Sequence, residues 1–168
     1  MNQFGKQLTE YIPRLRRYAR ALFRGDSTAA DDLVQDCLER ALDRQHYFRA
    51  NSNLRAWLFT IMHNIYVNRV RRQANVPDIV AAEPDSLPAS SRPEDAVALD
   101  DLSRAIQALP HEQKTVLLLV TLEGMSYREV ADMLEVPEGT VMSRLARARQ
   151  RLRAGLSGHR ETPLRRVK

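Results

Sequence analysis

The chain has 168 residues, of which 28% are charged and 43% hydrophobic, with a net charge of +5 and one cysteine. This composition is typical of one or two small soluble domains, and a single cysteine excludes an internal disulfide or a cysteine-rich zinc site. The longest apolar run, Val116 to Val120, is far too short to cross a membrane. Because the first residues lack the apolar segment of a secretion signal, we expect a cytoplasmic protein.

The charge is unevenly distributed along the chain. Residues 1–72 have a net charge of +6 and residues 140–168 of +8, whereas residues 94–139 have −7. Two basic regions separated by an acidic one predict two contacts with a polyanion, because segregated charge creates a strong local field. The alternative is that these regions are solvated charged helix faces.

Helical periodicity predicts an all-α fold made of two small helical domains joined by a flexible linker. Three helices are expected near 5–24, 28–44 and 53–73, and four near 94–108, 111–122, 126–134 and 137–155. Four prolines between residues 73 and 93 break helices and oppose burial. We therefore expect a domain at 1–73, a linker at 74–93, a second domain containing a helix-turn-helix at 94–156, and a basic tail at 157–168.

The helix expected at 28–44 separates apolar from acidic side chains. Its apolar side carries Leu33, Val34, Cys37, Leu38, Ala41 and Leu42, so we expect Cys37 to be a small core residue rather than a reactive thiol. Acidic residues follow the other side, namely Asp31, Asp32, Asp36, Glu39 and Asp43, with Asp26 just before the helix. This acidic side is either solvated or a docking surface for a basic partner.

The helix expected at 53–73 combines aromatic, amide and basic side chains. Apolar positions that include Trp57 alternate with Asn64, Asn68, Arg69, Arg71 and Arg72. Such a mixture suits single-stranded or distorted nucleic acid, because bases stack on rings while their edges meet amide groups. On this evidence alone, Trp57 is better explained as a core residue than as a base-stacking one.

Residues 126–153 have the pattern of a helix-turn-helix. Ser126 and Glu129 form a capping box that begins a short helix, and Pro137 suits the first turn of the next helix. That second helix should bury Val141, Leu145, Ala148 and Leu152, leaving a polar face of Thr140, Ser143, Arg144, Arg147, Gln150 and Arg151. The arrangement predicts insertion into the major groove of DNA. The alternative is a helical hairpin with a solvated basic side.

Three segments together resemble the extracytoplasmic-function group of bacterial RNA polymerase sigma factors. They are "ADDLVQDCLERAL", "LRAWLFTIMHNIYVNRVRR" and "ALPHEQKTVLLLVTLEGMSYREVADMLEVPEGTVMSRLARARQRLR". The resemblance covers roughly residues 8–73 and 94–155. It implies a promoter-melting domain followed by a domain that binds the upstream promoter element.

The resemblance also implies which residues bind each partner. By this resemblance, the residues expected to dock on the clamp helices of the polymerase beta-prime subunit are Asp32, Leu33, Gln35, Asp36 and Glu39. Reading of the minus-ten element, with one base flipped into a pocket, falls on Phe48, Arg49, Asn51, Ser52, Asn53, Trp57, Asn64, Asn68, Arg69, Arg71 and Arg72. Reading of the minus-thirty-five element falls on Ser126, Thr140, Met142, Ser143, Arg144, Arg147 and Arg151. Many relatives have arginine at Met142 and a bulky residue at Ala146, so the sequence preference is open.

No enzyme activity is indicated, because the four histidines are scattered without metal spacing or an accompanying nucleophile. We expect no metal, cofactor or small-molecule substrate. The resemblance implies core RNA polymerase, through its beta-prime clamp helices and beta flap, promoter DNA and an anti-sigma factor as partners. Two other classes remain open: a stand-alone helix-turn-helix regulator, and a sigma-mimicking adaptor that binds an anti-sigma protein.

Overall fold

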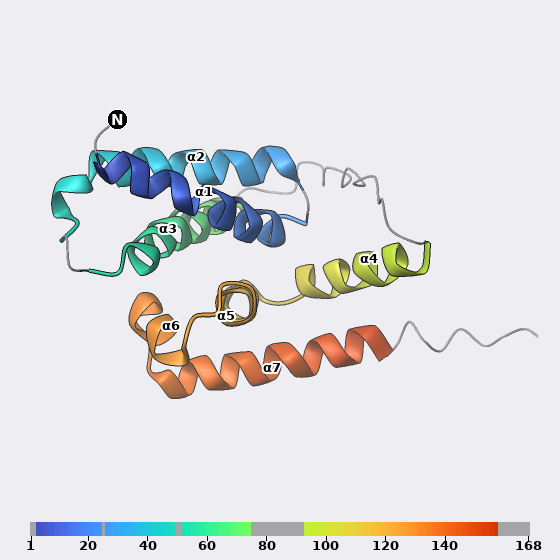
Figure 1. Cartoon of the computed structure of the whole chain (residues 1–168). Coiled ribbons are helices and arrows are strands. Elements are labelled where there is room, and N and C mark those ends of the chain that lie inside the picture. The colour runs from blue at the N-terminus through green and yellow to red at the C-terminus, as the bar shows by residue number, and fades with distance from the viewer. Residues whose placement is uncertain (1–2, 25, 50–51, 75–92, 158–168) are drawn as a thin grey trace, which may run out of the picture.

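The computed structural model describes residues 3–24, 26–49, 52–74 and 93–157, with the backbone alone for 93–96. All regular secondary structure in these ranges is helical (Figure 1). The elements are α1 Gln3–Leu22, α2 Ser27–Asp43, η1 Gln45–Tyr47, α3 Leu54–Ala74, α4 Pro93–Gln107, α5 His111–Thr121, α6 Tyr127–Leu134 and α7 Glu138–Ser157. The predicted all-α class is confirmed, and each predicted helix is present within two residues of its expected bounds. Residues 75–92 of the predicted linker, residues 158–168 of the predicted tail, and Asn51 lie outside the described residues.

Helices α1, α2 and α3 form the first helix group, in which α2 packs against both α1 and α3. Asp26 caps α2, because its side chain accepts a hydrogen bond from the backbone N–H of Ala29 at 3.0 Å. Cys37 is fully buried, as predicted, and its Sγ donates to the carbonyl oxygen of Leu58 at 3.5 Å. Burial raises the pKa of this thiol to about 12.

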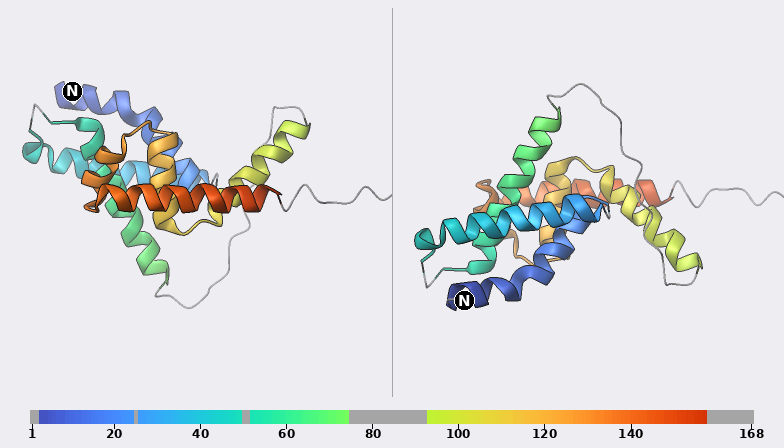
Figure 2. Two further views of the ribbon diagram at one scale, coloured as in Figure 1. Left: turned by 90° about the horizontal axis from the view of Figure 1, so that it is seen from below. Right: turned by 90° about the horizontal axis from the view of Figure 1, so that it is seen from above.

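Helices α4 to α7 form the second helix group, in which α7 packs against α4, α5 and α6. Val141, Leu145 and Ala148 of α7 are buried, as the periodicity predicted. Helix α4 lies along the C-terminal part of α7, where a Cβ at Gly155 would be 3.6 Å from that of Ala105. The N-terminal half of α4 projects beyond the rest of the molecule (Figure 2).

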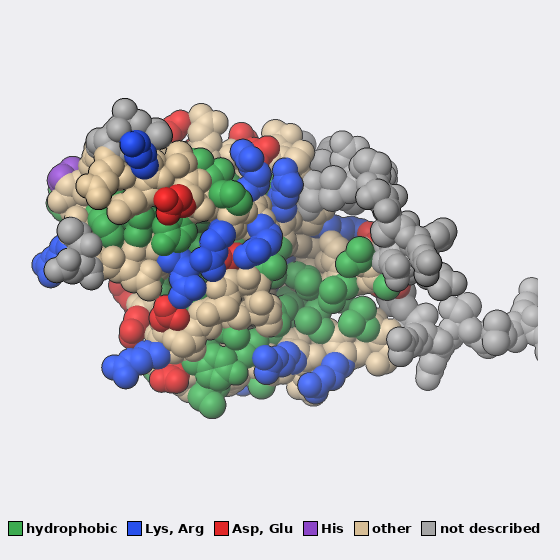
Figure 3. Space-filling view, viewed as in Figure 1, with side chains coloured by type: hydrophobic (Ala, Val, Ile, Leu, Met, Phe, Trp, Pro, Cys, Tyr) green, Lys and Arg blue, Asp and Glu red, His purple; other side chains and the backbone are tan. Residues whose placement is uncertain are grey.

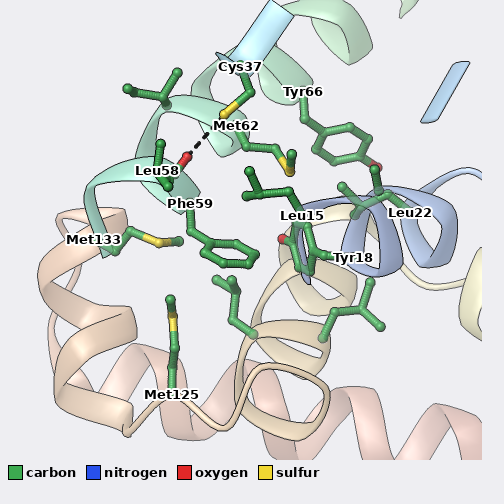
Figure 4. Close-up of a cluster of buried hydrophobic side chains, with 14 of the residues drawn as sticks. Leu15, Tyr18, Leu22, Cys37, Leu58, Phe59, Met62, Tyr66, Met125 and Met133 are labelled. Atoms are coloured by element: carbon green, nitrogen blue, oxygen red, sulfur yellow. Dashed lines mark hydrogen bonds between the residues drawn. The ribbon is translucent and has the colours of Figure 1, made fainter. Parts of the chain in front are cut away.

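The two helix groups are not separate bodies, because they share a continuous apolar core. Helix α6 packs on α3, and α5 packs on α1. Met125 and Met133 of the second group lie beside Phe59 of α3 (Figure 4). The physical reason is the composition of α5, which buries residues on every side, from Gln113 to Leu119. A helix that is buried on every side needs neighbours on both sides, and here α7 covers one side and α1 the other.

Candidate nucleic-acid interface

The helix-turn-helix is built by local hydrogen bonds that the sequence predicted. The Ser126 hydroxyl accepts from the backbone N–H of Glu129 at 3.2 Å, and the Glu129 carboxylate accepts from the backbone N–H of Ser126 at 2.8 Å. This capping box is confirmed. The N–H of Ser126, followed by Arg55, lowers the pKa of the Glu129 carboxyl. Helix α6 ends at Glu135, whose φ of 55° lies in the left-handed region.

Helix α7 presents a polar face to solvent. Met142, Ser143, Arg147 and Arg151 are exposed and Thr140 is half-buried. The Ser143 hydroxyl donates to the carbonyl oxygen of Thr140 at 3.1 Å. Figure 3 shows Lys and Arg side chains on the surface over α7. A basic, exposed helix preceded by a short capped helix has the geometry that major-groove binding requires.

Arg144 differs from its neighbours on this face. One of its terminal nitrogens lies 3.1 Å from a carboxylate oxygen of Glu112, at the start of α5, and its side chain is only 21% exposed. Ser126 is likewise engaged, since its hydroxyl belongs to the capping box. The structure therefore leaves Arg147 and Arg151 as the freely exposed arginines among the predicted upstream-element residues.

The predicted minus-ten residues fall into an exposed set and a packed set. Asn64, Asn68, Arg71 and Arg72 are exposed along α3. Trp57 and Phe48 are half-buried, with ring centroids 5.3 Å apart, and Phe4 lies beside both. Trp57 thus supports an aromatic cluster and also contributes to a surface.

The loop between η1 and α3 is shaped by its own polar groups. Arg49, Ser52 and Asn53 are exposed, and the Ser52 hydroxyl donates to the carbonyl oxygen of Arg49. The Asn53 side-chain oxygen accepts from the backbone N–H of Ala56 at 3.2 Å, so Asn53 caps α3. Its side-chain nitrogen lies 3.4 Å from Glu129 of the second helix group.

A hollow of about 450 Å³ lies beside this loop, lined by Arg44, Tyr47, Trp57 and Ile61. Tyr47 is 72% exposed, and its ring centroid lies 4.0 Å from that of His46. Of the four lining residues, the sequence analysis named only Trp57. The signal that could have found Tyr47 was its position among aromatic residues, next to Phe48 of the predicted minus-ten residues.

The predicted polymerase-docking residues lie on α2, and four of the five are exposed: Asp32, Gln35, Asp36 and Glu39. The prediction that Leu33 contacts polymerase is wrong for its side chain, because Leu33 is fully buried in the core. Periodicity already placed Leu33 on the apolar side of the helix, and burial follows from that side. Its role in this structure is to hold α2 in place.

Two of the predicted sites meet on the surface. Arg69 of α3 forms an ion pair with Asp36 of α2, with 2.7 Å between nitrogen and oxygen, and also approaches the carbonyl oxygen of Ala29 at 3.4 Å. Arg69 was predicted to contact DNA and Asp36 to contact polymerase. In this structure each one partly neutralises the other.

His63 of α3 faces the second helix group. Burial lowers the pKa of His63 to about 4, and His111 and Arg144 across the junction act in the same direction. His63 was not predicted as part of any site.

Among the described helices, none combines the length and apolar character that a bilayer span requires.

Comparison with known proteins agrees with this arrangement. A family model described as "Sigma2 domain of PhyR" matches residues 8–63, and one described as "Sigma-70, region 4" matches residues 99–152. The chain is 36% identical over 144 residues to the ECF RNA polymerase sigma factor EcfG of Rhodopseudomonas palustris, covering 85% of this chain and 79% of the relative. It is 37% identical over 159 residues to SigM, an ECF sigma factor of Mycobacterium tuberculosis, covering 95% and 79%.

A solved structure of a sigma factor is also similar to this chain. The sigma factor RpoE from Bartonella quintana, crystallised in complex with the anti-sigma factor NepR, superimposes with a TM-score of 0.74 and 31% identity, over 94% of this chain and 98% of that one. The fold and the exposed basic helix are those of a DNA-binding transcription protein made of two helix groups. The chain belongs to the extracytoplasmic-function sigma factors of bacterial RNA polymerase. Of the three classes that the sequence left open, the initiation subunit is therefore confirmed.

Proposed function

We propose that the exposed face of α7 reads the minus-thirty-five element and the exposed face of α3, with the preceding loop, reads the minus-ten element. The observation that supports this most is the exposure of Arg147 and Arg151 beyond a capped α6, on a chain that also exposes Asn64 and Asn68. An adaptor that only mimics a sigma factor has no need for two such faces. The catalysis of RNA synthesis then belongs to the polymerase, and the chain acts where the polymerase is, in the cytoplasm.

The same proposal assigns the chain's parts. Residues 1–73 would form the melting and polymerase-binding domain, 74–93 the linker, 94–156 the upstream-element domain and 157–168 a basic tail. Asp32, Gln35, Asp36 and Glu39 would dock on a basic surface of core polymerase, where complementary charge speeds association and fixes orientation. Because the Bartonella RpoE structure holds an anti-sigma factor, we also infer that this chain has such a partner.

Run-off transcription with core polymerase tests the assignment of α7. Arg147→Ala should weaken binding of the upstream element by about 1–3 kcal/mol, which is about 5- to 150-fold. Arg149→Ala is the matched control, because Arg149 is an exposed arginine of the same helix outside the predicted reading face. Equal amounts of run-off transcript from the two variants, at equal protein levels, would show that promoter recognition depends on the positive charge of α7 and not on its predicted reading face.

A further inference from the structure

Met142 is an exposed apolar side chain on the predicted reading face of α7. It lies in the second turn of the helix and is 52% exposed. Residues near the N-terminus of a recognition helix are the ones that meet base edges in the major groove. A single exposed methionine on an ordinary surface needs no explanation, but one that enters a groove must lose its water there. The chemistry of its contact is therefore constrained.

The side of α7 that carries Met142 is open in the described structure. A Cβ at Gly139, three positions before Met142, would meet no other part of the chain within 4 Å. Ala146, four positions after Met142, is exposed and has a short side chain. Between these two small residues, nothing prevents the Met142 side chain from reaching a partner.

The charges of α7 do not explain a contact at this point. The residues one helical turn from Met142 include no basic one: they are Glu138, Gly139, Leu145 and Ala146. The nearby Arg144 is paired with Glu112, and the Ser143 hydroxyl already donates to the carbonyl oxygen of Thr140. A thioether has no hydrogen to donate and is a weak acceptor. Met142 therefore contributes neither phosphate binding nor a strong hydrogen bond, and an apolar contact is what it can offer.

The major groove presents one prominent apolar group. Most groups on the edges of the base pairs are hydrogen-bond donors or acceptors, and the exception is the C5-methyl group of thymine. A methionine placed against donors or acceptors would displace their water and leave them unpaired, which weakens binding. Placed against a thymine methyl group, the same side chain costs no hydrogen bond, and its flexible, polarisable thioether adapts to the contact.

We propose that Met142 packs on the C5-methyl group of a thymine in the upstream promoter element and thereby selects a T·A pair at one position. The inference rests on the proposed function of α7, and it adds the chemical group that the second turn of this helix recognises. The exposed Arg147 and Arg151 supply contacts of a different kind, because a guanidinium binds phosphate or guanine. One face of α7 thus combines charged and apolar recognition.

Selection from random sequence locates the thymine. The full-length protein, assembled with core polymerase, selects templates from a pool in which the upstream promoter element is randomised. The parent should select a T·A pair at one position of this element. Met142→Ala should lose the preference at that position and keep the preferences at the others.

Exchange of thymine for uracil then isolates the methyl group. Uracil keeps the hydrogen-bonding edge of thymine and lacks only the methyl group. Uracil at the selected position should weaken binding of the parent holoenzyme about fourfold, which corresponds to about 0.8 kcal/mol for one methyl-sized group. Met142→Ala should bind the thymine template about fourfold more weakly than the parent and should not distinguish thymine from uracil, because the two changes remove the same contact.

Three further variants separate the apolar contact from other effects. Met142→Leu stays apolar and should retain part of the preference for thymine, whereas Met142→Gln has a similar length but is polar and should lose it. Leu99→Gln is the matched control, because Leu99 of α4 is 60% exposed and lies outside α7. This control should bind both templates like the parent. Circular dichroism and thermal unfolding show that each variant is folded.

Each outcome bears on the contact. A selected element without such a thymine, or equal binding of the thymine and uracil templates by the parent, would refute it. A thymine preference that survives in Met142→Ala would also refute it, and would favour a protein partner for the exposed side chain. A parent holoenzyme that selects no upstream sequence at all would overturn the proposed function of α7 and this contact with it.

Discussion

Replacing Glu112 by glutamine should strengthen binding of the upstream promoter element. In the free protein the Glu112 carboxylate holds Arg144 at 3.1 Å, so Arg144 must leave this ion pair before it contacts DNA. Glu112 is 53% exposed, and ion pairs at the surface contribute about 0.2–1 kcal/mol. Removing the pair should therefore raise affinity about 1.4- to 5-fold, and loss of one carboxylate near DNA phosphates adds to the gain.

Fluorescence anisotropy with an upstream-element duplex, at fixed salt, measures the effect. Glu10→Gln, an exposed position on α1 with the same change in charge, is the control and should bind like the parent. In an Arg144→Ala background the gain from Glu112→Gln should shrink, because the two residues act through one contact. Weaker binding by Glu112→Gln would show that Arg144 stays paired with Glu112 when the protein is bound to DNA. The same gain with and without Arg144 would show that Arg144 does not contact the DNA.

The remaining predictions concern melting, docking, capping and pH. Asn64→Ala should impair open-complex formation on duplex promoters but less so on premelted templates, and equal defects would exclude a role in base capture. Asp32→Arg should lower association with core polymerase in a native gel, whereas Glu10→Arg, exposed on α1 outside the acidic side of α2, should not. Ser126→Ala should lower the free energy of unfolding by about 1 kcal/mol through loss of the cap. Because the pKa of His63 is lower in the folded state than in the unfolded chain, stability should fall as pH drops from about 6.5 toward 4, and His63→Gln should flatten this part of a thermal-unfolding profile.

The helices and the helix-turn-helix could be predicted from the sequence because their causes are local. The spacing of Val141, Leu145 and Ala148 sets the buried side of α7, and Ser126 with Glu129 sets the start of α6. Such patterns need only neighbours within two turns of helix. The buried position of Leu33 had the same local cause, although the family motif placed it among the docking residues.

The contacts between the helix groups could not be predicted in the same way. Glu123 stands in the sequence as one acid in a polar turn, and nothing nearby indicates that its side chain is fully buried. Burial arises only after α5 packs on α1 and brings Arg14 and Arg17 to it. The pairing of Arg144 with Glu112 has the same origin, since it depends on how α5 meets α7.

The position of Cys37 determines how the protein responds to oxidants. Peroxides and disulfides react with an accessible thiolate, but this sulfur is enclosed by apolar side chains and carries its proton at neutral pH. It is also the only cysteine in the chain, so no neighbouring thiol is available to form an internal disulfide. The chain therefore cannot sense oxidants through a thiol of its own, and a thiol-based response to oxidative conditions must reach it through another molecule.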